Sequence, residues 1–398
     1  MGRRTQGRKI YKTKEKNYYG KTPMAKALSV ALTVLLIGGV GFIGYSVAEP
    51  IVNYSKKKGD ESVVTAASEE SLRPQVTEPS VPAAAENTAH EPAEYKAVAF
   101  RVGDLISKDT VKAAIDRIPS GQKFEYIEIP LKISGGNIYY QSSVMYAVNS
   151  GAVQNTIALS DVVEIIEKAG YKSAALISAF KDSRIPSIDP TTSYVTVASG
   201  EQWIDNDPSA GGKPWMTPYS SVAVNYIGDI VSEVSEAGFD RIICTDMTFP
   251  DFRRSDLELL SDELASKKRF QALTSAANLF YDRAVSNGAS MAIEISAPSI
   301  LKGNTDIIAE PLYLNVRSVI VNIDIDEISY GVYTDTTVYD FNGTAADKTA
   351  KMLELIKDKL EDYPNAAIRL SGTSVGTDEL LKAKEVIKDY GFTSYVIG

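Results

Sequence analysis

The sequence predicts an α/β protein, more specifically a (β/α)8 TIM barrel. From residue 96 onward, short apolar runs rich in valine, isoleucine and alanine alternate with longer segments of helical periodicity. Several helical segments end in glycine directly before the next strand, as helices do where a left-handed residue turns the chain. Eight strands alternating with helices are the pattern of a TIM barrel. The glycines concerned are Gly170, Gly238, Gly288 and Gly391.

The predicted strands are continuous apolar runs, which is typical of parallel strands that are covered on both faces. No helical segment follows the last strand, so an open doubly wound sheet is the alternative fold. The predicted strands cover residues 96–102, 124–131, 172–180, 239–247, 289–296, 317–324, 365–371 and 392–397. The predicted helices cover residues 109–118, 160–170, 219–237, 261–287, 344–362 and 377–390, with a weaker one near 304–311.

The first 94 residues predict a membrane anchor. Residues 1–26 carry nine lysines and arginines against one acid, and residues 27–48 carry no charge. An apolar helix of 22 residues is long enough to cross a hydrocarbon core of ~30 Å, and the basic residues before it predict a cytoplasmic N-terminus. Residues 49–94 are rich in serine, glutamate, alanine, threonine and proline, and predict a disordered stalk. We expect a single-pass protein of the cell membrane whose barrel, residues 95–398, is extracellular; the alternative is a signal peptide that is cleaved after Ala48.

The composition excludes several kinds of catalytic site. The sequence has one histidine, His90 in the predicted stalk, and one cysteine, Cys244 in an apolar run where a buried structural thiol is expected. The predicted barrel therefore has no Ser-His-Asp triad, no Cys-His dyad and no histidine-ligated zinc. After residue 26 the chain holds 33 basic and 50 acidic residues, a net charge of −17, which argues against a nucleic-acid ligand. An enzyme built on this sequence must use carboxylates.

An acidic cluster, Asp324, Asp326 and Glu327, lies at the end of one predicted strand. It lacks the spacing and the central glycine of an EF-hand loop, so we expect a solvated charged edge rather than a calcium site. We predict no metal and no cofactor.

Residues 238–250, GFDRIICTDMTFP, bring a carboxylate to the end of a predicted buried strand. Asp246 follows the apolar run 242–244, and Phe249-Pro250 stops the strand. TIM barrels carry their chemistry at the C-terminal ends of the strands, so Asp246 is a candidate catalytic residue. Alternate residues of each strand point into a barrel, and polar residues stand at such positions in other strands. These are Glu128, Glu294, Asn322, Asp324 and Arg369.

Two carboxyl groups are the catalytic machinery of most glycoside hydrolases. They lie about 5–5.5 Å apart in retaining enzymes and about 6.5–9.5 Å apart in inverting enzymes. Glu294 is the candidate acid/base, and Asp246 is the candidate nucleophile or stabilising carboxylate. The alternative is that Arg369 pairs with Glu128 or Glu294 as a buried ion pair, which needs no catalytic role to explain it.

The long loop 181–218 contains both tryptophans of the protein, Trp203 and Trp215, and Tyr219 follows it. Aromatic side chains on loops above a barrel form platforms for sugar rings. We therefore predict that these three residues help to bind a polysaccharide or a cell-wall glycan. The alternative is that the tryptophans cap the barrel mouth as packing residues.

Three segments in order resemble a bacterial family of glycosyl hydrolase domains that is related at a distance to α-amylase-type barrels. They read EIPLKISGGNIYY (128–140), SAFKDSRIP (178–186) and KPWMTPYSSVAVNYIGDIVSEVSEAGFDRIICTDMTFP (213–250). The resemblance covers residues 96–300 and implies an extracytoplasmic TIM barrel of glycan-active ancestry. Lys132, Lys181 and Asp182 match the family pattern and join the candidates for substrate binding. These candidates are Glu128, Lys132, Lys181, Asp182, Trp203, Trp215, Tyr219, Asp324 and Arg369.

The sequence departs from the family pattern at several acidic positions. Pro130 and Ser134 stand where the family has acids on its second strand, and Thr217 replaces the aspartate of its WVDPY segment. The family's aspartate on strand four falls on Thr245. Asp246 therefore comes one residue late, and it faces the helices unless a bulge turns it.

Three functions are consistent with these residues. The first is a surface-anchored glycoside hydrolase-like enzyme that acts on cell-envelope or environmental polysaccharide through Asp246 and Glu294, the latter matching the family's acid on strand five. The second is a non-catalytic glycan-binding or scaffolding barrel of the cell envelope, which the missing acids favour. The third is a structural spacer or assembly partner in a surface complex.

Overall fold

The computed structural model describes residues 91–260, 264, 269–303, 306–308 and 314–398. The described residues all belong to one compact unit of the chain. The predicted basic segment, the predicted membrane span and most of the predicted stalk lie outside the described residues. Within the described ranges, no helix is both long enough and apolar enough to cross a membrane.

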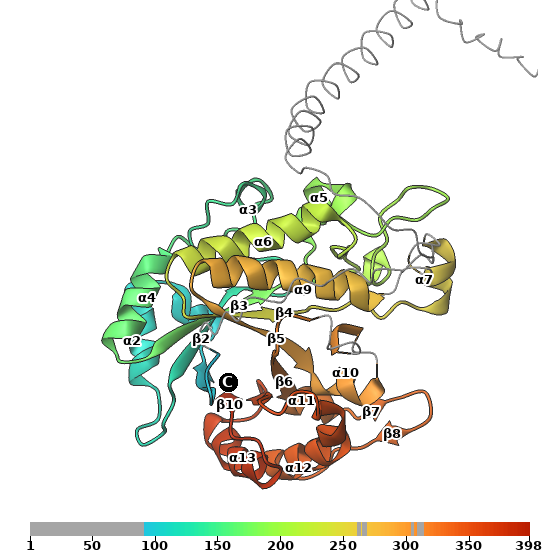
Figure 1. Cartoon of the computed structure of the whole chain (residues 1–398). Coiled ribbons are helices and arrows are strands. Elements are labelled where there is room, and N and C mark those ends of the chain that lie inside the picture. Colours follow the sequence, from blue (N-terminus) through green and yellow to red (C-terminus); the bar gives the residue numbers. More distant parts are fainter. Residues whose placement is uncertain (1–90, 261–263, 265–268, 304–305, 309–313) are drawn as a thin grey trace, which may run out of the picture. The chain divides into compact units, whose positions relative to one another are not determined.

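Eight parallel strands close into a barrel (Figure 1). Around the barrel the order is β1, β2, β3, β4, β5, β6, β9 and β10, and β10 completes the circle by pairing with β1. The predicted (β/α)8 barrel is confirmed, and the doubly wound alternative is wrong because an open sheet has no such last pairing. The strands are β1 Lys96–Ala99, β2 Tyr126–Lys132, β3 Lys172–Ser178, β4 Arg241–Thr245, β5 Ser290–Ser296, β6 Ser318–Asp324, β9 Ala367–Ser371 and β10 Tyr395–Ile397.

Helices alternate with the strands, and α6 and α9 pack side by side over β4 and β5 (Figure 1). Six helices overlap the six predicted helical segments: α2 Lys108–Asp116, α4 Leu159–Lys168, α6 Ser221–Glu236, α9 Arg269–Ser286, α12 Ala345–Ile356 and α13 Thr377–Asp389. The weaker segment near 304–311 forms a short 3-10 turn, Asp306–Ile308, in its described part. Shorter elements that were not predicted are α3 Met145–Asn149, α5 Arg184–Ile188, α7 Arg254–Leu259, α10 Ala297–Lys302, α11 Ile325–Ile328 and the hairpin of β7 Val332–Tyr333 with β8 Val338–Tyr339.

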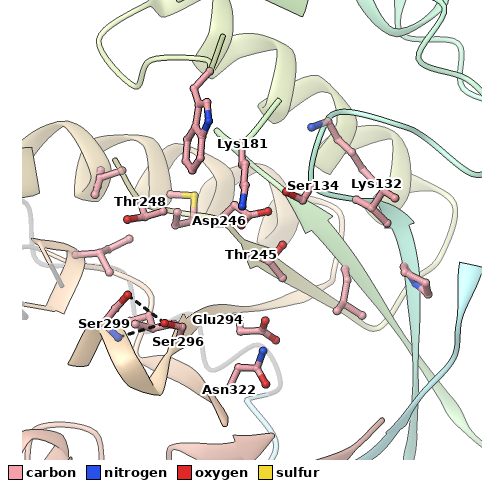
Figure 2. A pocket seen from close by; sticks show the side chains of 18 of the residues that line it. Lys132, Ser134, Lys181, Thr245, Asp246, Thr248, Glu294, Ser296, Ser299 and Asn322 are labelled. Atoms are coloured by element: carbon pink, nitrogen blue, oxygen red, sulfur yellow. Dashed lines mark hydrogen bonds between the residues drawn. The ribbon is translucent and has the colours of Figure 1, made fainter. Parts of the chain in front are cut away.

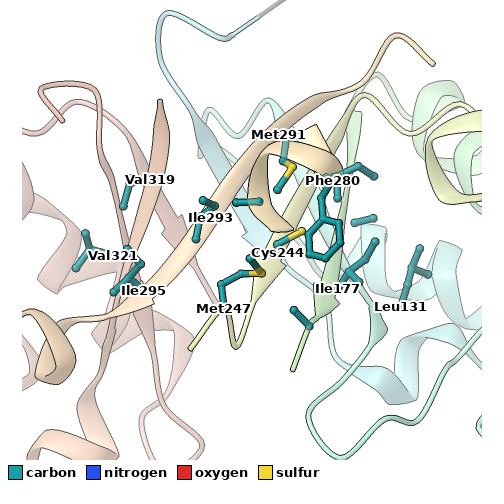
Figure 3. Close-up of a cluster of buried hydrophobic side chains, with 14 of the residues drawn as sticks. Leu131, Ile177, Cys244, Met247, Phe280, Met291, Ile293, Ile295, Val319 and Val321 are labelled. Atoms are coloured by element: carbon teal, nitrogen blue, oxygen red, sulfur yellow. The ribbon is translucent and has the colours of Figure 1, made fainter. Parts of the chain in front are cut away.

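Alternate side chains of each strand enter two separate apolar cores. In β4, Cys244 joins the outer core between strands and helices together with Phe280 of α9 (Figure 3), whereas Ile243 faces the barrel axis. Burial raises the pKa of the Cys244 thiol to about 12, in agreement with the predicted structural role. The same alternation places Glu294 of β5 in the inward-facing series with Ala292. The inner core comprises Tyr95, Ala97, Tyr126, Ala174, Ile243, Ala292, Ile320, Ala367 and Val396.

Candidate active site

A cavity of about 460 Å³ lies at the C-terminal ends of β2 to β6 (Figure 2). Each of these five neighbouring strands contributes at least one side chain to its wall. This is the end of the barrel at which TIM-barrel enzymes carry their active sites. The polar part of the wall consists of Lys132, Ser134, Lys181, Trp215, Thr245, Asp246, Thr248, Glu294, Ser296, Ser299, Asp306, Asn322 and Glu327.

Asp246 reaches the cavity because the backbone turns left-handed directly after β4. Its φ of 52° is the one positive φ of a non-glycine residue in the described part of the chain. Such a conformation costs about 1–2 kcal/mol for most residues, although aspartate adopts it more readily. β4 keeps a regular register with both neighbours, so no bulge is needed to turn the side chain. The Ser178 hydroxyl at the end of β3 then orients the carboxylate by donating a hydrogen bond of 2.6 Å to Asp246 Oδ2.

Glu294 lines the same cavity from β5, the neighbour of β4 (Figure 2). Its side chain is 14% exposed, and Arg369 Nε lies 2.6 Å from its Oε2. Burial raises the pKa of the Glu294 carboxyl group; Arg369 opposes this rise, whereas the charges of Glu128 and Asp246 add to it. A carboxyl group with a raised pKa keeps its proton closer to neutral pH, as a general acid must.

Glu128 and Arg369 lie inside the barrel rather than in the wall of the cavity. Both side chains are almost fully buried, and the Arg369 guanidinium contacts both Glu128 Oε2 and Glu294 Oε2. Tyr95 donates a hydrogen bond of 2.9 Å to the other oxygen of Glu128. The predicted buried ion pair is therefore present, with two acids sharing one arginine. Arg369 contacts Glu294 directly, Glu128 reaches it only through Arg369, and neither Glu128 nor Arg369 lines the cavity.

Lys132 at the end of β2 and Asp182 after β3 form a fully buried ion pair, with Nζ and Oδ2 2.8 Å apart. Lys132 Nζ also donates to the Ser178 carbonyl oxygen at 2.8 Å, and the Arg184 backbone N–H donates to Asp182 at 2.8 Å. The backbone of Gly136 passes so close that any side chain there would collide with the Asp182 carboxylate. Asp182 neutralises Lys132, so this pair ties β2 and β3 together beside the cavity.

Trp215 lines the cavity, and Trp203 does not. The Trp215 indole N–H donates to Asp205 at 2.9 Å, and Lys181 Nζ lies 5.3 Å from the centre of the Trp215 ring. Trp203 is buried and packs edge-on against Phe252, with ring centres 4.9 Å apart. Of the two tryptophans, Trp215 therefore reaches the cavity, whereas Trp203 takes the packing position that was the alternative.

Tyr219 and Asp324 are not in the wall of the cavity that holds Asp246 and Glu294. Tyr219 packs on the aromatic ring of Phe249 and lines a separate cavity of about 130 Å³. Asp324 ends β6 and caps α11 by accepting hydrogen bonds from backbone N–H groups. Within the described ranges, no three histidine, cysteine, aspartate or glutamate side chains are arranged to hold a metal ion.

Sequence reasoning did not single out Ser178 or Asp306. Ser178 is the last residue of β3 and belongs to the inward-facing series of Ala174 and Leu176, so strand alternation offers a signal for it. Asp306 lies on the short turn after α10, and burial raises the pKa of its carboxyl group. No periodic pattern marks such a turn residue, because its position over the barrel is set by tertiary packing.

A family model described as "Putative glycosyl hydrolase domain" matches residues 102–333, more than half of the chain. The chain belongs to this family. The resemblance carried by residues 96–300 is thereby confirmed. The part of the chain that matches the glycosyl hydrolase family includes β2 to β6 and therefore Glu128, Asp246 and Glu294, whereas Tyr95 and Arg369 lie outside it.

Three solved structures are similar to parts of this chain. The glycoside hydrolase domain of PgaB (BpsB) from Bordetella bronchiseptica is 13% identical, covers 77% of this chain and 93% of its own length, and gives a TM-score of 0.50. The α-galactosidase TtGalA from Thermus thermophilus is 12% identical over 77% of this chain and 58% of its own, with a TM-score of 0.46. A hypothetical protein from Ruminiclostridium thermocellum is 19% identical over 49% of this chain and 96% of its own, with a TM-score of 0.41. The likeness to PgaB shows the fold alone. A comparison with curated proteins found no match to the chain.

Proposed function

We propose that this protein is a membrane-anchored, extracytoplasmic glycoside hydrolase that acts on cell-envelope or environmental polysaccharide. One observation carries the proposal: Asp246 and Glu294, from neighbouring strands, line one cavity at the C-terminal end of a barrel of the glycosyl hydrolase family. The composition also favours catalysis by carboxyl groups. The sequence has one histidine, at position 90, and one buried cysteine, so the barrel lacks the residues of a histidine- or cysteine-based site.

In the proposed reaction, Glu294 is the general acid and Asp246 is the nucleophile or the stabilising carboxylate. Protonated Glu294 donates its proton to the glycosidic oxygen while the bond to the anomeric carbon breaks. The Asp246 carboxylate stabilises the positive charge that develops on the sugar, and Ser178 keeps this carboxylate oriented. Glu294, now ionised, takes a proton from the water that completes hydrolysis. Trp215 offers its ring to an adjacent sugar.

Glu294→Gln and Asp246→Asn test the enzymatic function, because each removes one carboxyl group while keeping its shape. The assay is the release of reducing ends from cell-wall glycan and from a panel of exogenous polysaccharides. Each substitution should lower turnover by about 100-fold or more. Glu167→Gln, on the exposed face of α4, is the matched control and should turn over normally. Unchanged turnover in Glu294→Gln would rule out this residue as the acid.

Glycan binding without cleavage is a second candidate, and one observation favours it: Arg369 engages Glu294 in a buried ion pair. A binding barrel should release no reducing ends from any polysaccharide, yet it should bind glycan. Trp215→Ala should then weaken the affinity at least about fivefold, as truncation of an aromatic anchor does. Detectable turnover by the wild-type protein, lost in Glu294→Gln, would contradict this function.

The membrane anchor is tested on intact cells of the source organism or of a bacterial host. External protease should remove the barrel while the cytoplasmic marker proteins survive. Mass spectrometry of the membrane fraction should find peptides of residues 1–26, because an anchor is retained. A mature protein that begins directly after Ala48 would instead establish the signal-peptide alternative.

A further inference from the structure

A chain of polar contacts runs through the inside of the barrel to Glu294. It begins at Tyr95, whose hydroxyl donates to Glu128 Oε1 at 2.9 Å. The other oxygen of Glu128 contacts Arg369, and Arg369 Nε lies 2.6 Å from Glu294 Oε2. Tyr95 and Glu128 are buried, and the side chains of Arg369 and Glu294 are 5% and 14% exposed. Glu294 is thus the member of this chain that reaches the cavity.

The chain is assembled from four separate parts of the sequence. Tyr95 directly precedes β1, Glu128 lies on β2, Glu294 on β5 and Arg369 on β9. Two further contacts hold Tyr95 in place. Its backbone N–H donates to Ser394 Oγ, and its ring packs at a tilt against that of Tyr126 with centres 4.8 Å apart. The contact of Arg369 with Glu128 spans the closing strands β10 and β1, so the chain from Tyr95 to Glu294 is complete only in the closed barrel.

We propose that Tyr95, Glu128 and Arg369 are positioning residues that orient the Glu294 carboxyl group and adjust its affinity for a proton from inside the barrel. The proposal rests on the role of Glu294 in the proposed function. Two acids share one arginine, so each competes with the other for its charge. Glu128 limits how strongly Arg369 stabilises ionised Glu294, and Tyr95 orients Glu128 for this competition.

Several charged groups face Glu294 from the elements around it. Arg369 of β9 favours the ionised form, whereas Glu128 of β2 and Asp246 after β4 disfavour it. The remaining titratable groups in the cavity wall are Lys132, Lys181, Asp306 and Glu327. Of these, Lys132 is neutralised by Asp182. Of the two close carboxylates, Glu128 is the one that also contacts the arginine, which makes it the informative residue to change.

Glu128→Gln removes a negative neighbour and leaves Arg369 with Glu294 as its remaining acidic partner. The pKa of Glu294 should therefore fall by about one unit or more, the size of the effect of one close charge. The measurement is a pH titration of the full-length protein labelled with carboxyl-13C glutamate, in which the Glu294 signal is identified by its loss in Glu294→Gln. If the protein hydrolyses glycan, the alkaline limb of its pH profile should move to lower pH by the same amount.

Tyr95→Phe keeps the ring and its packing and removes the hydroxyl group. It should shift the Glu294 titration in the wild-type background and leave it unchanged in the Glu128→Gln background, because Tyr95 acts through Glu128. If the role of Tyr95 were purely structural, Tyr95→Phe would lower thermal stability equally in both backgrounds and would leave the Glu294 titration unchanged in both. If Glu128→Gln does not fold, the titration of Glu294 in Tyr95→Phe alone tests the proposal, because this substitution retains every apolar contact.

A Glu294 that titrates identically in the wild-type protein and in these variants overturns the proposal. This outcome is distinct from failure of the proposed function, because the titration needs no turnover. A protein without hydrolytic activity whose Glu294 titration shifts as expected would retain the positioning chain and lose the enzymatic assignment. If the protein hydrolyses glycan but its Glu294 titration does not shift in the variants, the enzymatic assignment stands and the positioning chain is refuted.

Discussion

Lys132→Met tests whether the buried pair of Lys132 and Asp182 holds the site together. Both side chains are fully buried, with Nζ and Oδ2 2.8 Å apart. At an effective dielectric constant of about 20, two unit charges at this distance attract each other by about 6 kcal/mol, before the cost of removing them from water is counted. Removing one partner of a buried pair costs about 3–5 kcal/mol, because the other charge stays buried without compensation.

We expect the lower part of this range, a loss of about 3–4 kcal/mol in the free energy of unfolding. Asp182 keeps two backbone donors after the substitution, the N–H groups of Arg184 at 2.8 Å and Ile185 at 3.3 Å. In a large domain, each kcal/mol lost from the free energy of unfolding lowers Tm by about 2–4 °C, so Tm should fall by about 6–16 °C.

The assay is urea denaturation followed by circular dichroism, extended to a double-mutant cycle with Asp182→Asn. The double variant should cost at least about 1 kcal/mol less than the sum of the single variants, because each single variant leaves one partner of the pair unmatched. Lys168→Met is the matched control: it breaks the exposed pair with Glu164 on α4 and should cost less than about 0.5 kcal/mol. A loss below about 1 kcal/mol for Lys132→Met, or strict additivity, would refute the reasoning.

Two further predictions concern Ser178 and Asp326. Ser178→Ala removes the hydrogen bond to Asp246 and should lower kcat about tenfold or more with little change in KM; steady-state kinetics with an unaltered kcat would count against Ser178 as the orienting residue. Hydrogen bonds from Ser374 and Thr373 lower the pKa of Asp326 to about 2, so its stabilising contribution is complete above the unfolded-state pKa of about 4 and is lost as the pH falls to about 2. Melting curves between pH 5 and pH 2 should therefore show the wild-type protein losing Tm more steeply than Asp326→Asn, and parallel losses would contradict this linkage.

The barrel was predictable from the sequence because its buried strands are continuous apolar runs and several of its helices end at glycine. The ends of the strands were less predictable. The predicted strand 239–247 ends at Thr245, because the backbone of Asp246 is left-handed and cannot continue an extended strand. The helices α10 and α11 were missed because six and four residues are too few to establish a helical period.

The site was predictable to the extent that it depends on strand alternation. Glu294 follows from its inward-facing position in β5, and so do Glu128 and Arg369. That Arg369 bridges both acids depends on barrel closure, which places β9 and β2 on either side of the short strands β10 and β1. The burial of Trp203 depends on how loop 181–218 packs against the segment after β4 that holds Phe252, and no periodicity in the sequence encodes that.

The left-handed backbone at Asp246 limits how mutants of this position can be interpreted. Alanine removes the carboxylate and also pays the full steric penalty of the positive φ, so a loss of activity in Asp246→Ala would mix lost chemistry with a displaced β4 terminus. Glycine relieves the penalty but loosens the turn that aims the neighbouring residues. Asparagine tolerates this backbone and matches the shape of aspartate, which makes Asp246→Asn the substitution that isolates the charge.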